Sequence, residues 1–297
     1  MLRSWSRALS FYVFGEQRGE VGIKIARRIK YAAQVAYVGT KYAGWQRQIG
    51  APSVQQVLEE ALGHLSPEPV KVVGAGRTDG GVHAVGQVAS FEMNREWDAD
   101  RLTIAANFYL PSDVSLMRVV RVSDDFNARH GALWREYRYF IWHGRSLWPH
   151  LRDMVWWRKH EWNDASVREA CRILQGSHDF RAFCKTGECP EKSTRTLSRL
   201  RYKKIGSLSI IIARAPSFLM NMVRIIVGSL DRVGRGEEPA SRLWELLGEI
   251  EGRTPDRRLN GVTAPACGLY LWRVAYENVS FPGSRRSILG GVADVRN

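Results

Sequence analysis

The chain has 297 residues, and its 44 Lys and Arg against 30 Asp and Glu give a formal net charge of +14. With 44% hydrophobic and 25% charged residues, the composition excludes a fibrous or largely disordered chain, and the length excludes a small disulfide- or metal-stapled scaffold. The positive charge favours a polyanionic partner, with nucleic acid ahead of an anionic membrane surface. No apolar run is long enough to span a bilayer, so we expect no membrane-embedded segment.

The cysteines do not form a disulfide framework or a metal site. Cys171, Cys184, Cys189 and Cys267 contain no CxxC pair. Cys184 and Cys189 together with His178 match no zinc spacing. We therefore expect reduced thiols in an intracellular protein and predict no metal.

The first 29 residues are basic and rich in serine, with scattered apolar positions. They contain no apolar stretch followed by a small-residue cleavage site, which argues against a secretory signal. We expect residues 1–29 to form a disordered basic tail and residues 281–297 a second tail. The expected location is the cytoplasm; the alternative is an organelle, with the basic tail as a transit peptide.

Residues 30–125 are predicted to form a first α+β unit in the order β-α-β-β-α-β. Its strands are expected at Tyr31–Tyr37, Val70–Ala75, Gln87–Glu92 and Val114–Val122, and its helices at Ser53–Leu65 and Asp100–Tyr109. The first helix has a marked start, because Ser53 and Gln56 have the spacing of a capping box.

Residues 133–280 are predicted to repeat this order. The expected elements are a strand at Trp134–Trp142, a helix at Asp164–Gln175, a hairpin of Thr194–Lys204 with Leu208–Arg214, helices at Phe218–Val233 and Arg242–Ile250, and a strand at Leu269–Tyr276. Both halves thus have the order of a ferredoxin-like or RRM-like split βαβ unit, an α+β fold. Such units leave one sheet face open and often bind RNA across it.

Basic residues alternate along the predicted strand Thr194–Lys204. Because side chains alternate between the two faces of a strand, its cations are expected to share one face. These residues are Arg195, Arg199, Arg201 and Lys203. They are candidates for contacts with a nucleic-acid phosphate backbone; the alternative is an ordinary solvated face.

A glycine-rich connection stands between two predicted strands, at GAGRTDGGVHA from Gly74 to Ala84. It matches neither a Walker loop nor a dinucleotide fingerprint. Its glycines allow positive φ angles and close approach to a ligand, although such a segment can also be an ordinary turn. Arg77 lies two residues before Asp79, so a cation and a carboxylate could share one site, where the cation would keep the carboxylate ionised as a nucleophile.

Several motifs, taken in order, resemble those of the TruA-type tRNA pseudouridine synthases over about residues 30–276. They are YVGTKYAGWQRQ at 37–48, SVQQVLE at 53–59, GRTDGGVHA at 76–84, YRY at 137–139, GSHDF at 176–180, MVRIIVG at 222–228 and APACGLYL at 264–271. The resemblance implies the pseudouridine synthase fold, with a central mixed, mainly antiparallel sheet and a cleft between two halves. The sequence departs from the family pattern at Gly80, where family members commonly have alanine.

The resemblance also implies an activity and residues that carry it. The family isomerises uridines 38, 39 and 40 in the anticodon stem and loop of tRNA, without a cofactor and as a homodimer. Asp79 would be the catalytic aspartate, Arg77 would help displace the target base, Tyr137 would pack under the uracil, and Arg224 would pair with the aspartate. Further substrate-binding candidates from the matching motifs are Gly76, Thr78, His83, Trp45, Gln46 and Arg47.

Two arguments from the residues stand beside this resemblance. Arg224 lies in a predicted apolar helix, so it is either on a narrow exposed stripe or a buried charge that needs a partner such as Asp79. The alternative function is a non-catalytic RNA-binding protein of two RRM-like units. No predicted strand has the aromatic pattern that RRM domains use to stack bases.

Overall fold

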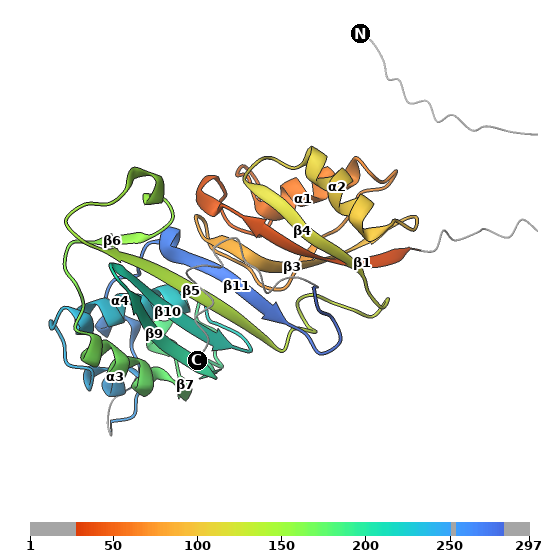
Figure 1. Ribbon diagram of the computed structural model, residues 1–297. Helices are drawn as coiled ribbons and strands as arrows, with labels where there is room; N and C mark the ends of the chain where they lie inside the picture. The colour runs from red at the N-terminus through yellow and green to blue at the C-terminus, as the bar shows by residue number, and fades with distance from the viewer. Residues whose placement is uncertain (1–27, 251–253, 282–297) are drawn as a thin grey trace, which may run out of the picture.

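The computed structural model describes residues 28–250 and 254–281, which contain one large sheet flanked by helices. Within these residues nine strands form one sheet. Seven of them lie in the order β4-β1-β3-β11-β5-β10-β9, while β2 pairs with β3 and β6 pairs with β5 (Figure 1). Both antiparallel and parallel pairs occur, so the predicted α+β fold with a mixed, mainly antiparallel sheet is confirmed. Within the same ranges, no helix has the length and hydropathy needed to cross a membrane. The predicted tails at 1–29 and 281–297 lie almost entirely outside the described residues.

The first half has the predicted order of elements. They are β1 (Ile29–Tyr37), α1 (Val54–Gly63), β2 (Val73–Gly74), β3 (His83–Met93), α2 (Ala99–Tyr109) and β4 (Val114–Arg121). In space the strands lie in the order β4-β1-β3-β2, as in a ferredoxin-like unit. α1 begins where predicted, because the Ser53 hydroxyl accepts the Gln56 N–H at 3.3 Å, although the Gln56 side chain bonds forward to Glu60.

β2 is much shorter than the predicted strand Val70–Ala75. The backbone groups of Val72 are bonded to side chains of α1, since its carbonyl accepts from Gln55 and its N–H donates to Glu59. The paired residues of β2 are Val73 and Gly74, and the Ala75 N–H after them donates to the Val88 carbonyl of β3 at 2.7 Å.

The second half repeats the topology. Its ferredoxin-like elements are β5 (Trp134–His143), α3 (Asp164–Leu174), β9 (Arg199–Ile205), β10 (Leu208–Ala215), α4 (Met222–Gly234) and β11 (Leu269–Ala275). The strand order is β11-β5-β10-β9, which equals β4-β1-β3-β2 of the first half. The short β6 (Trp156–Arg158) and α5 (Arg242–Leu246) are additions to this unit.

Some predicted boundaries in the second half are wrong. The strand expected at Thr194–Lys204 breaks at Ser198: β8 (Thr194–Leu197) pairs with β7 (Gly176–Asp179) in a separate sheet, while β9 pairs with β10. Arg195 is therefore not in the same strand as the other three cations. α4 begins at Met222 and not at Phe218, because Asn221 before it has a left-handed backbone with φ of 61°.

The two halves are joined by a parallel pair between β3 and β11. Tyr270 lies opposite His83 and Leu271 opposite Ala84, at the end of β3 that β2 leaves free. Gly86 permits this approach, since a Cβ there would lie 2.2 Å from the Trp272 carbonyl oxygen. The glycine-rich connection thus comes directly before the strand that joins the halves.

The main core lies between the sheet and the helices. In the second half, odd-numbered β5 residues such as Tyr139 face α3 and α4, and even-numbered residues face the other side of the sheet. On that other side a smaller apolar cluster contains Phe140, Val155, Ile210 and Ile212. One face of this sheet therefore packs against the helices and the other against the smaller apolar cluster. A residue's position along its strand decides on which of the two faces it lies.

Candidate active site at the join of the two halves

The loop that carries Asp79 is held by backbone contacts with a second loop. Asp79 forms an isolated β-bridge with Gly44, and the Trp45 N–H donates to the Thr78 carbonyl at 3.0 Å. Gly44 has φ of 125°, and a Cβ there would lie 2.6 Å from the Thr78 oxygen. A glycine is therefore required on the partner loop, and the two loops hold the Asp79 backbone in place.

Gly80, the departure from the family pattern, has no such requirement. Its φ is not positive, and an added Cβ would make its nearest contact with Ala43 backbone atoms at 3.4 Å. An alanine would fit at this position, whereas the following Gly81 has φ of 77°. The departure leaves the path of the loop unchanged.

Asp79 and Arg224 meet across the join, as the paired roles predict. The Arg224 Nη1 lies 3.4 Å from the Asp79 Oδ2, and their side chains are 18% and 27% exposed. The guanidinium is also held by the Ala264 carbonyl, which accepts from Nε at 2.8 Å, and by the Asn221 side chain, which accepts from Nη1 at 3.1 Å. Arg224 is thus a fixed, half-buried cation with one carboxylate beside it, and the carboxylate keeps access to solvent.

Tyr137 forms an aromatic wall beside this pair. It lies on β5, is 8% exposed, and packs edge-on against Phe218 with ring centroids 5.1 Å apart. Its hydroxyl lies beside Gly76, where an added Cβ would be 3.7 Å away. Burial raises the pKa of Tyr137 above its usual value, and the electrostatic influence of Tyr37 and Asp79 raises it further. The hydroxyl therefore stays protonated at neutral pH.

Arg77 lies at the exposed surface of the same loop. Its Nε donates to the Gln46 side chain at 3.1 Å, and Asp79 is paired with Arg224 instead. The cation in direct contact with Asp79 is therefore Arg224, and Arg77 lies beside the same loop without an ion pair to Asp79. Arg47 next to Gln46 pairs with Glu59 at 3.0 Å. Arg77, Gln46 and Arg47 form an exposed polar rim near the Asp79 loop.

Three other candidates are buried supports. Thr78 shares a hydrogen bond of 2.8 Å with Tyr37, and Trp45 packs its indole against Gly74. His83 is stacked on Tyr270, and its Nδ1 accepts the Gly39 N–H at 3.0 Å. Burial lowers the pKa of His83.

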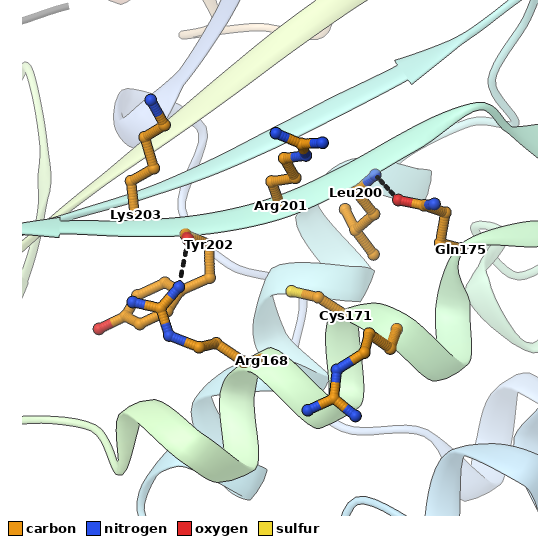
Figure 2. Close-up of a pocket in the computed structure, with 8 residues that line it drawn as sticks. Arg168, Cys171, Gln175, Leu200, Arg201, Tyr202 and Lys203 are labelled. Carbon is orange, nitrogen blue, oxygen red and sulfur yellow. Dashed lines mark hydrogen bonds between the residues drawn. The ribbon is translucent and has the colours of Figure 1, made fainter. Parts of the chain in front are cut away.

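The cations of β9 lie on the face of the sheet opposite to Tyr137. Tyr137, Ala213 and Leu200 are cross-strand partners and share the α3 side, whereas Arg201 is one residue out of that register. Figure 2 shows Arg201 and Lys203 pointing away from α3, above a groove of about 430 Å³ that Arg168 and Cys171 line from below. Arg199, Arg201 and Lys203 keep the predicted common face, and Arg195 does not join them.

The sequence did not reveal one important support, Arg135. Its guanidinium donates to the carbonyls of Ala75 at 2.7 and 3.1 Å, Pro216 at 2.6 Å, Arg129 at 2.6 Å and Ala132 at 3.3 Å. It thereby ties the start of the Asp79 loop to the connection between the halves and to the segment before α4. Its partners are backbone carbonyls, most of them in distant segments, so the local sequence carries no signal for these contacts.

Within the described residues, no three His, Cys, Asp or Glu side chains come together in a way that could hold a metal ion. A carboxylate, a fixed cation and a buried aromatic ring at one site are instead suited to nucleophilic chemistry on a flat, neutral ring.

Comparison with known proteins shows the family. A family model described as tRNA pseudouridine synthase matches residues 33–130 and 170–277, which include Asp79 and Arg224. The chain belongs to this family. Its enzymes are isomerases that convert uridine to pseudouridine in tRNA, so the alternative of a non-catalytic RRM-like protein is not favoured. Tyr137 lies between the two matched segments, and its assignment depends on the contacts described above.

Bacterial relatives match more than four-fifths of the chain. The tRNA pseudouridine synthase A of Cereibacter sphaeroides is 41% identical over 252 residues, covering 83% of this chain and 96% of the relative. That of Thermoanaerobacter sp. (strain X514) is 38% identical over 242 residues, covering 82% and 97%. That of Pseudomonas aeruginosa is 40% identical over 249 residues, covering 83% and 85%.

Proposed function

We propose that this enzyme isomerises uridines 38, 39 and 40 in the anticodon stem and loop of tRNA, with Asp79 as the catalytic residue. The observation that carries the proposal is the ion pair, 3.4 Å long, between Asp79 on its glycine-bounded loop and Arg224 on α4, at the join of the halves. Family membership supports the substrate class and the reaction.

The reaction suits a carboxylate. The C1′–N1 bond of the nucleotide breaks, the uracil turns, and C5 bonds to C1′; C5 loses its proton and N1 gains one, so no redox partner or donor is consumed. Asp79 acts as nucleophile, through an adduct at the ribose C1′ or at the base. Arg224 stabilises the negative charge of the carboxylate before attack and whenever it leaves again.

Tyr137 and Arg77 act on the base. The target uridine must leave its stack, which costs a few kcal/mol. The Tyr137 ring then receives the uracil on its face, and its protonated hydroxyl adds no competing negative charge. Arg77 is exposed and held by Gln46, a suitable position for filling the gap left by the base. Gly76, Thr78, Trp45, Arg47 and His83 serve the same loop as contacts or supports.

The cations of β9 contact another part of the tRNA. β9 lies four strand positions from β3, roughly 19 Å at 4.8 Å per strand, and its cations face away from Tyr137. Arg199, Arg201 and Lys203 thus bind backbone phosphates distant from the target uridine, and Arg195 binds from the adjoining small sheet.

As the family resemblance implies, we propose that the enzyme works as a homodimer without a cofactor. Since its proposed substrate is tRNA, we place it in the cytoplasm; the basic segment before residue 28 is the feature that would direct it to an organelle.

The direct test is a chemical map of pseudouridine in unmodified tRNA incubated with the protein. We expect new pseudouridine at positions 38 to 40. Asp79→Asn keeps the size of the side chain and removes its charge, so it should lower the single-turnover rate at least about 10³-fold while tRNA affinity stays close to that of the wild type. Conversion by Asp79→Asn at the normal rate would refute the assignment of Asp79, and modification only elsewhere would refute the proposed positions.

A further inference from the structure

A second aromatic and basic feature lies outside the site described above. We define the Trp148 loop as residues 144–155, between β5 and β6; in Figure 1 it is light green and stands out from the sheet above β6. The family model matches residues 33–130 and 170–277, so this loop falls between its two segments.

The base of the Trp148 loop is firmly attached. Leu147, Leu151 and Met154 pack against the apolar cluster on the face of the sheet opposite to Tyr137. The Tyr270 hydroxyl donates to the Met154 carbonyl at 2.9 Å, and a short 3-10 helix, Pro149–Leu151, closes the loop. The loop therefore presents its outer side chains from a fixed support.

The outer side of the loop is aromatic. Trp148 is 61% exposed, and its ring lies 6.1 Å from that of His150. Nearby, Trp157 is 40% exposed, with its indole N–H bonded to the Gly144 carbonyl at 2.9 Å. The Trp148 indole is therefore held with its apolar surface open to a binding partner.

The charged residues of this segment are mostly positive. Between residues 144 and 160 the cations are Arg145, Arg152, Arg158 and Lys159, against the single acid Asp153. Arg158 is paired with Asp231, and the other three cations are exposed. An exposed aromatic face on a segment rich in exposed cations complements a nucleobase with its phosphates, because stacking and charge attraction act together.

The loop also lies at the catalytic end of the sheet. Tyr270, which holds Met154, is the β11 partner of His83, and His83 follows Asp79 by four residues. RNA bound at Asp79 can therefore extend to this end of the molecule. We infer that Trp148 stacks on an unpaired base of the bound tRNA other than the target uridine, with Arg145, Arg152 and Lys159 on the adjoining phosphates. This inference rests on the proposed function, since it takes tRNA as the ligand.

The test measures the Kd of unmodified tRNA for the full chain with Trp148→Ala, Trp148→Phe and the control Trp244→Ala. Trp244 is another exposed tryptophan, 38% exposed, on α5. Trp148→Ala should raise Kd about 5- to 150-fold, Trp148→Phe should recover much of the loss, and Trp244→Ala should stay within about twofold. The salt dependence of Kd should not change in Trp148→Ala, whereas Arg152→Ala should lower its slope by about 1.

Several results would overturn the inference. One is a Trp148→Ala Kd equal to that of Trp244→Ala. Another is an unchanged Kd with an altered oligomeric mass, which would assign the loop to contacts between copies of the chain. Failure of the proposed function is a separate result, because it would appear as wild-type protein that forms no pseudouridine in the same tRNA.

Discussion

The two halves of the molecule share a topology but differ in one strand, and this difference creates the site. In the second half, β9 has seven residues and forms the outer edge of the sheet. Its equivalent in the first half, β2, has two residues. The free part of β3 accepts β11 in parallel, so the Asp79 loop of one half comes against α4 of the other. A shortened strand thus turns two repeated units into one composite site.

Among the residues that support this junction without joining the Asp79–Arg224 pair, the largest effect is expected from Arg135→Lys. Arg135 bonds four carbonyls in three segments, and a lysine cannot make this forked set of contacts. The Asp79 loop should shift relative to α4, so we expect kcat to fall about 10- to 100-fold. KM for tRNA should change little, because the side chain is occupied by backbone carbonyls.

The matched control is Arg121→Lys. Arg121 lies on β4 and forms an exposed ion pair with Glu96. A kcat for Arg135→Lys as high as that of this control would show that the three segments hold their places without Arg135.

Next in size is an effect on the stability of the β3–β11 pair, which is the seam between the two halves. Gly86→Ala would place a Cβ 2.2 Å from the Trp272 carbonyl, so β3 and β11 would have to separate. We expect a loss of about 1–3 kcal/mol in the free energy of unfolding, measured by urea denaturation.

Gly63→Ala is the control, because an added Cβ at this end of α1 meets nothing within 4 Å. It should stabilise the protein by up to about 1 kcal/mol. Equal stabilities for the two variants would mean that the seam is not as closely packed as described.

The smallest effect is a pH dependence at the seam. Burial lowers the pKa of His83 in the folded state, while the unfolded chain has the ordinary value of about 6.5. As the pH falls below that value, the unfolded state takes up a proton that the folded state does not, so stability is lost, by at most about 1.4 kcal/mol per pH unit.

Replacing His83 with glutamine should therefore flatten the decline in unfolding free energy between pH 7 and pH 5, followed by urea denaturation at several pH values. An identical slope in both proteins would exclude His83 as a source of this dependence.

Local patterns in the sequence predicted the elements well and their long-range partners poorly. The helix start at Ser53 depends on a side chain and a backbone group three residues apart, so the sequence alone predicted it. The break at Ser198 could not, because alternation along the chain is the same whichever strand pairs with it, and Arg195 was placed wrongly. The β3–β11 pair and the contacts of Arg135 join distant segments and leave no local signal.

In the candidate site too, local features could be predicted from the sequence and long-range contacts could not. The Asp79 loop could be singled out from its glycines, and a buried Arg224 was expected to need a carboxylate. Which carboxylate it meets depends on the fold as a whole. Arg77, two residues from Asp79 in sequence, turns instead toward Gln46. Proximity along the chain was a poor guide to the ion pair.

The central claim is that Asp79 of one half and Arg224 of the other act as a pair. The most direct measurement is the single-turnover rate of pseudouridine formation by Arg224→Leu, with Arg224→Lys as the variant that keeps the charge. We predict a fall of at least about 100-fold for leucine, partial recovery for lysine, and near-normal tRNA affinity in both. A correctly folded Arg224→Leu protein that converts uridine at the wild-type rate would contradict the account.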